Sequence, residues 1–183
     1  VRRHHPRRQR LRPHAHVPPP TVHLGCAAMT GPELLAGAYH LLLSELVRSG
    51  RALHYTELAD VLGMAPSEGL AVQQALTESG IPIFTQAGTD YLAGFTPFSN
   101  IPTHCRITVD GEQRWYAICA VEALAVSWLF PDRQVTIDSP CLDCGDPVRI
   151  VMRDGAVLEL APATTVVHTN IPAARWSEDW AYA

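Results

Sequence analysis

The amino-acid sequence predicts an α+β fold, in which a helical first part precedes a smaller part with antiparallel strands and a buried helix that carries a cysteine. Three observations predict this arrangement. Apolar residues recur with helical spacing through 32–79, short alternating segments separated by glycine turns occupy 81–168, and an apolar run at 114–130 lies among those strands. Hydrophobic residues make up 47% of the 183 residues, which is enough for a packed core.

Capping and stop residues delimit the helices of the first part. Pro32 suits the first turn of the first helix, and Gly50 ends it. Thr56 is the expected cap of the second helix, which stops at Gly63. Two helices joined by a glycine-containing turn and followed by a hairpin are typical of a winged helix. The predicted elements are the helices 32–47, 55–63 and 66–79 and the hairpin strands 81–85 and 91–95, which together form a winged-helix-like domain within 29–95.

The second part, 96–183, is predicted to be a small mixed α+β domain. It begins with a proline-containing link at 96–103 and a strand that leads into the turn Asp110-Gly111. The helix that carries Cys119 follows. Short strands separated by glycine turns complete the predicted sheet. The predicted strands are 105–109, 134–138, 148–152, 157–160 and 164–168.

The first 28 residues differ from the rest in composition. They are rich in Arg, His and Pro and lack apolar periodicity, so we predict a disordered leader that precedes a natural start at Met29. Six of the fourteen basic residues lie there and no acidic residue does, so the remaining chain carries eight basic against eighteen acidic residues. That negative body argues against tight DNA binding, which depends on neutralising phosphates.

Two further classes of protein are disfavoured. No apolar stretch reaches the roughly 20 residues that a membrane helix needs. The five cysteines form an odd set without a secretory signal, which indicates reduced thiols in the cytoplasm. They are Cys26, Cys105, Cys119, Cys141 and Cys144.

Cys119 and Glu122 form the most informative pair. If 114–130 is helical, their spacing of three residues places thiol and carboxyl on the same face. A soft nucleophile beside a proton donor can attack a thiophilic metal and protonate the group that leaves it. The structural alternative is that Cys119 is a small buried hydrophobe and Glu122 a solvated side chain.

Cys141 and Cys144 form a CxxC motif ahead of a strand. A structural zinc site usually has four ligands, and His104, His168, Cys105 or Cys119 could supply the others. A redox motif is expected at a helix N-terminus, whereas a turn and a strand follow here. A metal or thiol-chemical role, with zinc or copper as the ion, and a packing role both remain open for this motif.

Several short motifs resemble, in their order along 29–183, the organomercurial (alkylmercury) lyase family. The most specific is Tyr116-Ala-Ile-Cys119-Ala, followed by an acidic residue. The others are Pro102-Thr-His104, Ser139-Pro-Cys141 before a Gly-Asp-Pro-Val turn, and a late His168 that leads to Glu178-Asp-Trp-Ala181.

The resemblance implies protonolysis of a carbon–mercury bond without an added cofactor, with an organomercurial or a soft metal ion as ligand. It implies that Cys119 is the nucleophile and that Glu122, in place of the family's Asp, is the proton donor. Thiolate binding to mercury would make the carbon basic enough to accept a proton from a buried carboxyl of raised pKa. It also implies that Thr103, His104 and His168 lie near the pocket.

Two departures from the family pattern concern the chemistry. Glu122 is one methylene longer than Asp, which moves the acid outward. The family has a second cysteine just before the late histidine, where this chain has Val166-Val167-His168. Cys141, which matches a structural cysteine of the family, or Cys144 is therefore a candidate for the second thiolate beside Cys119.

Two alternatives to a lyase follow. One is a catalytically impaired protein that holds mercury, copper or zinc through Cys119, Cys141 and Cys144, and the missing second cysteine favours it. The other is a metal-responsive regulator whose winged helix binds DNA. The predicted reading helix, 66–79, offers Gln73 and Gln74 but no basic residue, which argues against that regulator.

Overall fold

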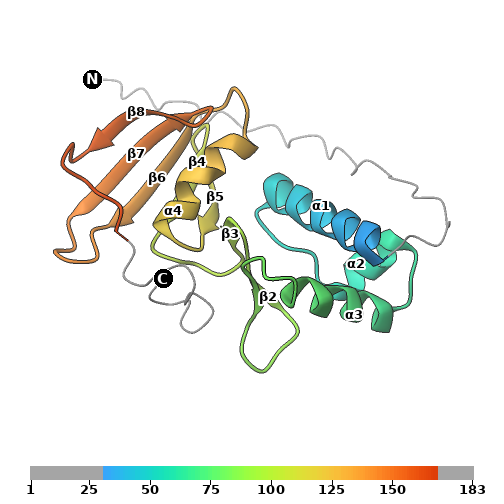
Figure 1. Ribbon diagram of the computed structural model, residues 1–183. Coiled ribbons are helices and arrows are strands. Elements are labelled where there is room, and N and C mark those ends of the chain that lie inside the picture. The colour runs from blue at the N-terminus through green and yellow to red at the C-terminus, as the bar shows by residue number, and fades with distance from the viewer. Residues whose placement is uncertain (1–30, 169–183) are drawn as a thin grey trace, which may run out of the picture.

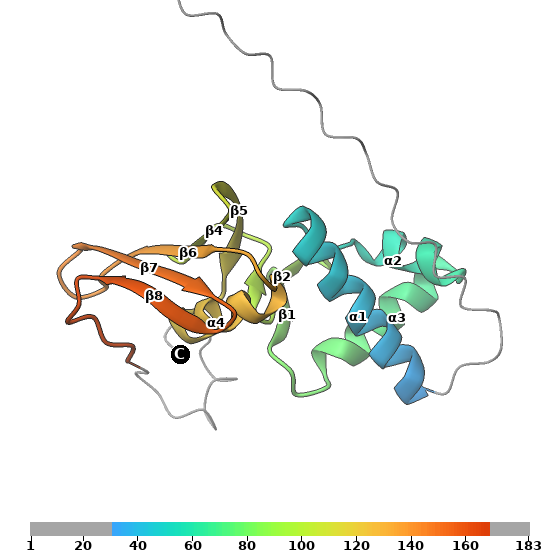
Figure 2. The ribbon, with the colours of Figure 1, turned by 90° about the horizontal axis from the view of Figure 1, so that it is seen from above.

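The computed structural model describes residues 31–168, and the predicted leader at 1–28 lies outside them. Three helices, α1 (Gly31–Ser49), α2 (Tyr55–Leu62) and α3 (Pro66–Thr77), gather at one end of the molecule. A twisted antiparallel sheet extends from them, and α4 (Ala120–Ala125) lies on one face of that sheet (Figures 1 and 2). The predicted α+β class is confirmed.

The helix ends follow local backbone chemistry. Gly50 and Gly63 adopt positive φ angles of 76° and 69°, so the predicted stops of α1 and α2 are confirmed. The predicted cap Thr56 is wrong, because His54 is the N-cap of α2 and its ring accepts from the Thr56 amide. Glu57 completes the capping box by accepting from the His54 amide at 2.8 Å.

The strands within 31–168 belong to one sheet. Its order is β1-β2-β3-β5-β4-β6-β7-β8, and every neighbouring pair is antiparallel. The strands are β1 (Ile83–Thr85), β2 (Leu92–Phe95), β3 (Phe98–Ser99), β4 (Arg106–Val109), β5 (Glu112–Ala117), β6 (Val135–Pro140), β7 (Pro147–Arg153) and β8 (Ala156–Ala161).

The predicted hairpin at 81–95 is present as β1 and β2, but the winged-helix comparison is not confirmed. The strand β3, inside the predicted link, pairs with both β2 and β5, so the hairpin is continuous with the main sheet. One hydrophobic core likewise includes Leu42 of α1, Phe95 of β2 and Ile137 of β6. Because the sheet and the core both continue across residue 95, the structure offers no boundary there, and the division into two domains stays a prediction.

Two side chains from β5 attach the sheet to α1. The indole Nε1 of Trp115 donates to the Leu46 carbonyl at 2.7 Å, and Arg114 donates to the Arg48 carbonyl at 3.0 Å. Trp115 is buried and packs edge-on against Phe130 at 5.0 Å. A buried indole that finds a hydrogen-bond acceptor orients the two elements as well as filling space.

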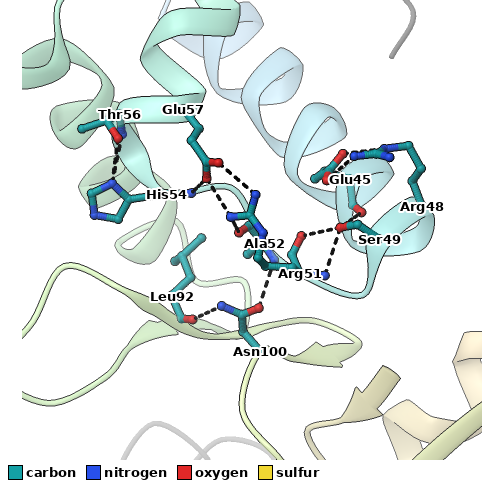
Figure 3. Close-up of polar contacts among 10 residues, drawn as sticks. All are labelled: Glu45, Arg48, Ser49, Arg51, Ala52, His54, Thr56, Glu57, Leu92 and Asn100. Atoms are coloured by element: carbon teal, nitrogen blue, oxygen red, sulfur yellow. Dashed lines mark hydrogen bonds and ion pairs between the residues drawn. The ribbon is translucent and has the colours of Figure 1, made fainter. Parts of the chain in front are cut away.

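Asn100 connects the α1–α2 loop to the sheet (Figure 3). Its carbonyl oxygen accepts from the Ala52 amide at 3.0 Å, and its amide donates to the Leu92 carbonyl at 2.9 Å. Next to it, Arg51 forms an exposed ion pair with Glu57. A single short polar side chain therefore satisfies backbone groups from two parts of the fold.

The structure corrects two further predictions. Residues 114–117 belong to β5, so the helix near Cys119 is shorter than the apolar run 114–130 and begins at Ala120. Residues 164–168 are not a strand, because the Thr165 amide bonds to the Pro162 carbonyl in a turn after β8 and Val166 is 83% exposed. No helix within 31–168 is long and apolar enough to cross a membrane.

Candidate functional site

Cys119 lies between β5 and α4, as the N-cap residue of that helix. Its backbone is extended, with φ −145° and ψ 176°, and its carbonyl accepts the first helical hydrogen bond, from Ala123 at 2.9 Å. The prediction that Cys119 lies within a helix is therefore wrong by one position. Its relation to Glu122 survives, because Glu122 is the third residue of α4 and lies in its first turn, where an N-cap residue and the residue three positions later approach one another.

Glu122 is half-buried and faces the loop after β2. The hydroxyl of Thr96 donates a short hydrogen bond to its Oε1 atom. Burial raises the pKa of Glu122 above its ordinary value, whereas the Thr96 hydroxyl and the thiol and amide of Cys119 act in the opposite direction. The net upward shift favours a protonated carboxyl, which is the form that can donate a proton.

The Cys119 thiol is half-buried beside this carboxyl. Burial is the largest influence and raises its pKa, while the amides of Glu122 and Val121 lower it and the negative charge of Glu122 raises it. The free thiol therefore keeps its proton at neutral pH. A soft metal would shift that balance, since thiophilic ions bind the thiolate and displace the proton.

Thr103 supports the strand that leads to Cys119. Its hydroxyl donates to the Ala117 carbonyl at 2.6 Å and accepts from the Cys105 amide at 3.3 Å. The other two residues expected near the pocket, His104 and His168, are exposed. Within 31–168 neither of them makes a hydrogen bond or ion pair with Cys119 or Glu122.

The CxxC motif forms a turn beyond β6. The Cys141 amide donates to the Asp146 carbonyl at 2.7 Å, and the Gly145 amide donates to the Cys141 carbonyl at 2.9 Å. The pKa of Cys141 is lowered by the backbone amides of Cys144 and Asp143 and by the Cys144 thiol. The Asp146 amide lowers the pKa of the exposed Cys144, but the Cys141 thiol, burial and Asp146 together raise it overall.

The structure does not bring Cys119, Cys141 and Cys144 together as a ligand set. Across residues 31–168, no group of three or more His, Cys, Asp or Glu side chains is placed to hold a metal ion. The prediction of zinc or copper at the CxxC turn gains no support, because a structural zinc site needs further ligands that these residues do not supply.

From the sequence, Cys105 was a candidate only as a further zinc ligand for the CxxC motif, not as a residue of the Cys119–Glu122 site. It is 7% exposed and immediately precedes β4, and its carbonyl accepts from Ala117 at 3.0 Å. Burial raises its pKa, the Ser139 hydroxyl lowers it, and the charge of Glu122 raises it. The motif Pro102-Thr-His104 ends next to it, but only strand pairing reveals that it lies near Glu122.

Comparisons with known proteins point to one family. The sequence model described as "MerB: Alkylmercury lyase" matches residues 98–183. Proteins described as alkylmercury lyases from Bacillus cereus and Clostridium butyricum are each 31% identical over 130 residues, which cover 71% of this chain and 56% of theirs. One from Streptomyces lividans is 30% identical over 133 residues. The chain is a divergent member of the alkylmercury lyase family.

A solved structure shares the fold. It is described as the crystal structure of the mercury-bound form of MerB2, and it matches with a TM-score of 0.51 and 24% identity over 70% of this chain and 68% of that one. The chain spans only 56% of the length of the first two alkylmercury lyases that it matches.

The side chains of α3 argue against the predicted role of this helix in reading DNA. Gln73, one of the two amides that could have faced bases, is buried in α3, and its Nε2 atom donates to the Asp90 carbonyl at 2.7 Å. Glu68 caps the same helix through the Ala65 amide. These contacts give Gln73 a structural role in holding the β1–β2 loop against α3.

Proposed function

We propose that this chain cleaves carbon–mercury bonds by protonolysis, with Cys119 as the nucleophile and Glu122 as the proton donor. The observation that carries the proposal is the half-buried Glu122, whose pKa is raised beside the Cys119 thiol at the start of α4. Membership of the alkylmercury lyase family supports the same substrate class. No cofactor is required, because nucleophile and acid are both side chains of the protein.

The first step is ligand exchange at mercury. The Cys119 sulfur forms a bond to mercury, and the bond between mercury and the small-molecule thiolate that carried it into the site breaks. The Cys119 proton passes to that departing thiolate. An alkylmercury bound to Cys119 and a free thiol result. The mercury atom then lies beside Glu122, because the acid is three residues further along the same helix start.

The second step is proton transfer to carbon. The Glu122 carboxyl gives its proton to the carbon, and the electron pair of the carbon–mercury bond becomes the new carbon–hydrogen bond. A hydrocarbon leaves, and the Glu122 carboxylate lies beside the Hg²⁺ that Cys119 retains. Thr96 contributes by fixing Oε1 of Glu122 through its hydroxyl, which turns the carboxyl toward one defined direction.

Anaerobic incubation of the full chain with a phenylmercury salt and a thiol buffer tests this proposal. We expect benzene from the wild type and none above background from Cys119→Ser or Glu122→Gln, with Cys141→Ser as an active control. Glu122→Gln should still retain phenylmercury, because Cys119 is intact. Benzene from Cys119→Ser at the wild-type rate would overturn the assignment of the nucleophile.

A second candidate is a soft-metal-binding protein that keeps the pocket without the chemistry. The two valines before His168, where the family has a cysteine, favour it. This protein would hold mercury at Cys119 in the same benzene assay and release no hydrocarbon. All four cysteines within 31–168 are free thiols, and a reducing compartment such as the cytoplasm would keep them available for either role.

A further inference from the structure

We propose that Cys105 supplies the second thiolate for mercury at this site, in place of the family cysteine that the chain lacks at 166–167. The inference rests on the proposed function, since it assigns a further ligand to the same site. It departs from the sequence-based candidates, Cys141 and Cys144, because the structure places a different thiol next to the Cys119–Glu122 pair.

Strand pairing brings Cys105 to Cys119. The register of β4 and β5 pairs Arg106 with Tyr116, so the preceding residue, Cys105, lies opposite Ala117. The Ala117 amide donates to the Cys105 carbonyl at 3.0 Å. Cys119 follows Ala117 by two residues with an extended backbone, so the two cysteines lie at neighbouring positions on adjacent chain segments.

The two side chains also share a face of the sheet. Alternation along β4 places Cys105 on the same side as Ile107 and Val109, both of which are fully buried. α4 covers one face of the sheet in Figures 1 and 2, and its buried Ala123 belongs to the same hydrophobic core as Cys105, Ile107 and Val109. Ala117, opposite Cys105, is buried in the same layer. The Cys105 thiol therefore lies under the start of α4, where Glu122 is.

Cys105 has two polar neighbours. On the β6 side, the register that pairs Arg106 with Asp138 places Ser139 opposite Cys105, and the Ser139 hydroxyl interacts with the Cys105 thiol. The charge of Glu122 acts on Cys105 and on Cys119 alike, so both thiols lie within electrostatic reach of one carboxyl. A cysteine that serves only as a small hydrophobe needs neither neighbour.

Mercury requires fewer ligands than zinc. Hg²⁺ is held firmly by two thiolates, so the absence of a group of three ligands within 31–168 does not conflict with a two-sulfur site. After protonolysis, the Cys105 sulfur forms a bond to the mercury that Cys119 holds, and the Cys105 proton passes to the Glu122 carboxylate. That transfer balances the charge of the bound ion and restores the acid for the next cycle.

The test uses Hg²⁺ itself and does not depend on hydrocarbon release. In the full chain, Cys26, Cys141 and Cys144 are replaced by Ser, which leaves Cys105 and Cys119 as the remaining thiols. X-ray absorption at the mercury edge counts the sulfur neighbours of the bound ion, and mass spectrometry of the undenatured protein gives the mercury-to-chain ratio. We expect one mercury per chain with two sulfur neighbours.

Cys105→Ser and Cys105→Ala in that background should leave one protein sulfur and lose mercury to an excess of monothiol that the parent resists. Circular dichroism and thermal unfolding confirm that each variant is folded, and the parent's own sulfur count stands even if a variant is not. Three outcomes would overturn the inference. They are one protein sulfur on mercury in the parent, one mercury shared between two chains, or unchanged retention of mercury against monothiol in a folded Cys105 variant. A two-sulfur site that releases no benzene would uphold it while the lyase proposal fails.

Discussion

The Thr96 hydroxyl donates a hydrogen bond to Oε1 of Glu122 and thereby joins the segment between β2 and β3 to the first turn of α4. The contact connects the part of the sheet next to the N-terminal helices with the candidate acid. It also lowers the pKa of Glu122 against the larger upward effect of burial. The protonation of the acid therefore depends on a residue that lies 26 positions away in the sequence.

Replacing Thr96 with Val removes that donor while nearly preserving side-chain shape. Because the hydroxyl lowers the pKa of Glu122, its loss should raise that pKa further, and the alkaline limb of benzene release should move to higher pH. The loss of orientation should reduce the rate at the optimum. A pH profile of the rate measures both, with Thr89→Val, in the exposed β1–β2 loop, as the control. An alkaline limb that stays in place in Thr96→Val would contradict the assignment.

Glu122 should make the folded state less stable as pH rises. Its folded-state pKa is raised above the unfolded value, so its stabilising contribution is complete below the unfolded pKa and is lost as pH rises through the folded pKa. Glu122→Gln should remove this loss. Urea unfolding at several pH values should show the variant gaining stability relative to wild type as pH increases. A difference that does not change with pH would mean that Glu122 titrates normally.

Cys141 should be the first of the described thiols to react with iodoacetamide near neutral pH. Two turn amides and the Cys144 thiol lower its pKa, whereas burial raises the pKa of Cys105 and of Cys119. Timed alkylation followed by peptide fragmentation would give the order. The same reaction in urea should abolish the differences, and equally fast labelling of Cys119 in the folded protein would contradict the prediction.

Asn100→Ala should destabilise the fold without touching the site. It leaves the Ala52 amide and the Leu92 carbonyl without their partner, and the cost of such unsatisfied groups is about 1–3 kcal/mol. Arg51→Ala, which breaks the neighbouring exposed pair with Glu57, should cost less than about 1 kcal/mol. Chemical denaturation of both variants measures the difference. Equal losses would mean that Asn100 does not hold the loop to the sheet.

Local signals in the sequence predicted the helices well. Gly50 and Gly63 end α1 and α2 as expected, because a left-handed residue at a helix C-terminus is a property of the local backbone. The Asp110-Gly111 turn also has positive φ at both residues, as the hairpin between β4 and β5 needs. The cap of α2 was misplaced because His54 is an uncommon capping residue.

Predictions that depended on distant partners succeeded less often. The two residues of β3 carry too little periodicity to predict a strand, so the sequence predicts a link there, yet β2 and β5 pair with β3 on both sides. The segment 164–168 has strand composition, but its backbone follows a turn at Pro162 and does not extend β8. Strand composition alone does not supply the neighbouring backbone that a strand needs.

The sequence by itself determined the α+β class, the ends of α1 and α2, and the close spacing of Cys119 and Glu122, because each depends on composition or on residues a few positions apart. Tertiary structure alone decided that Cys119 caps α4, that Thr96 bonds to Glu122, and that Cys105 rather than the CxxC pair lies beside them. These relations depend on strand register, which couples residues far apart in the chain and is set by burial of one face of the sheet.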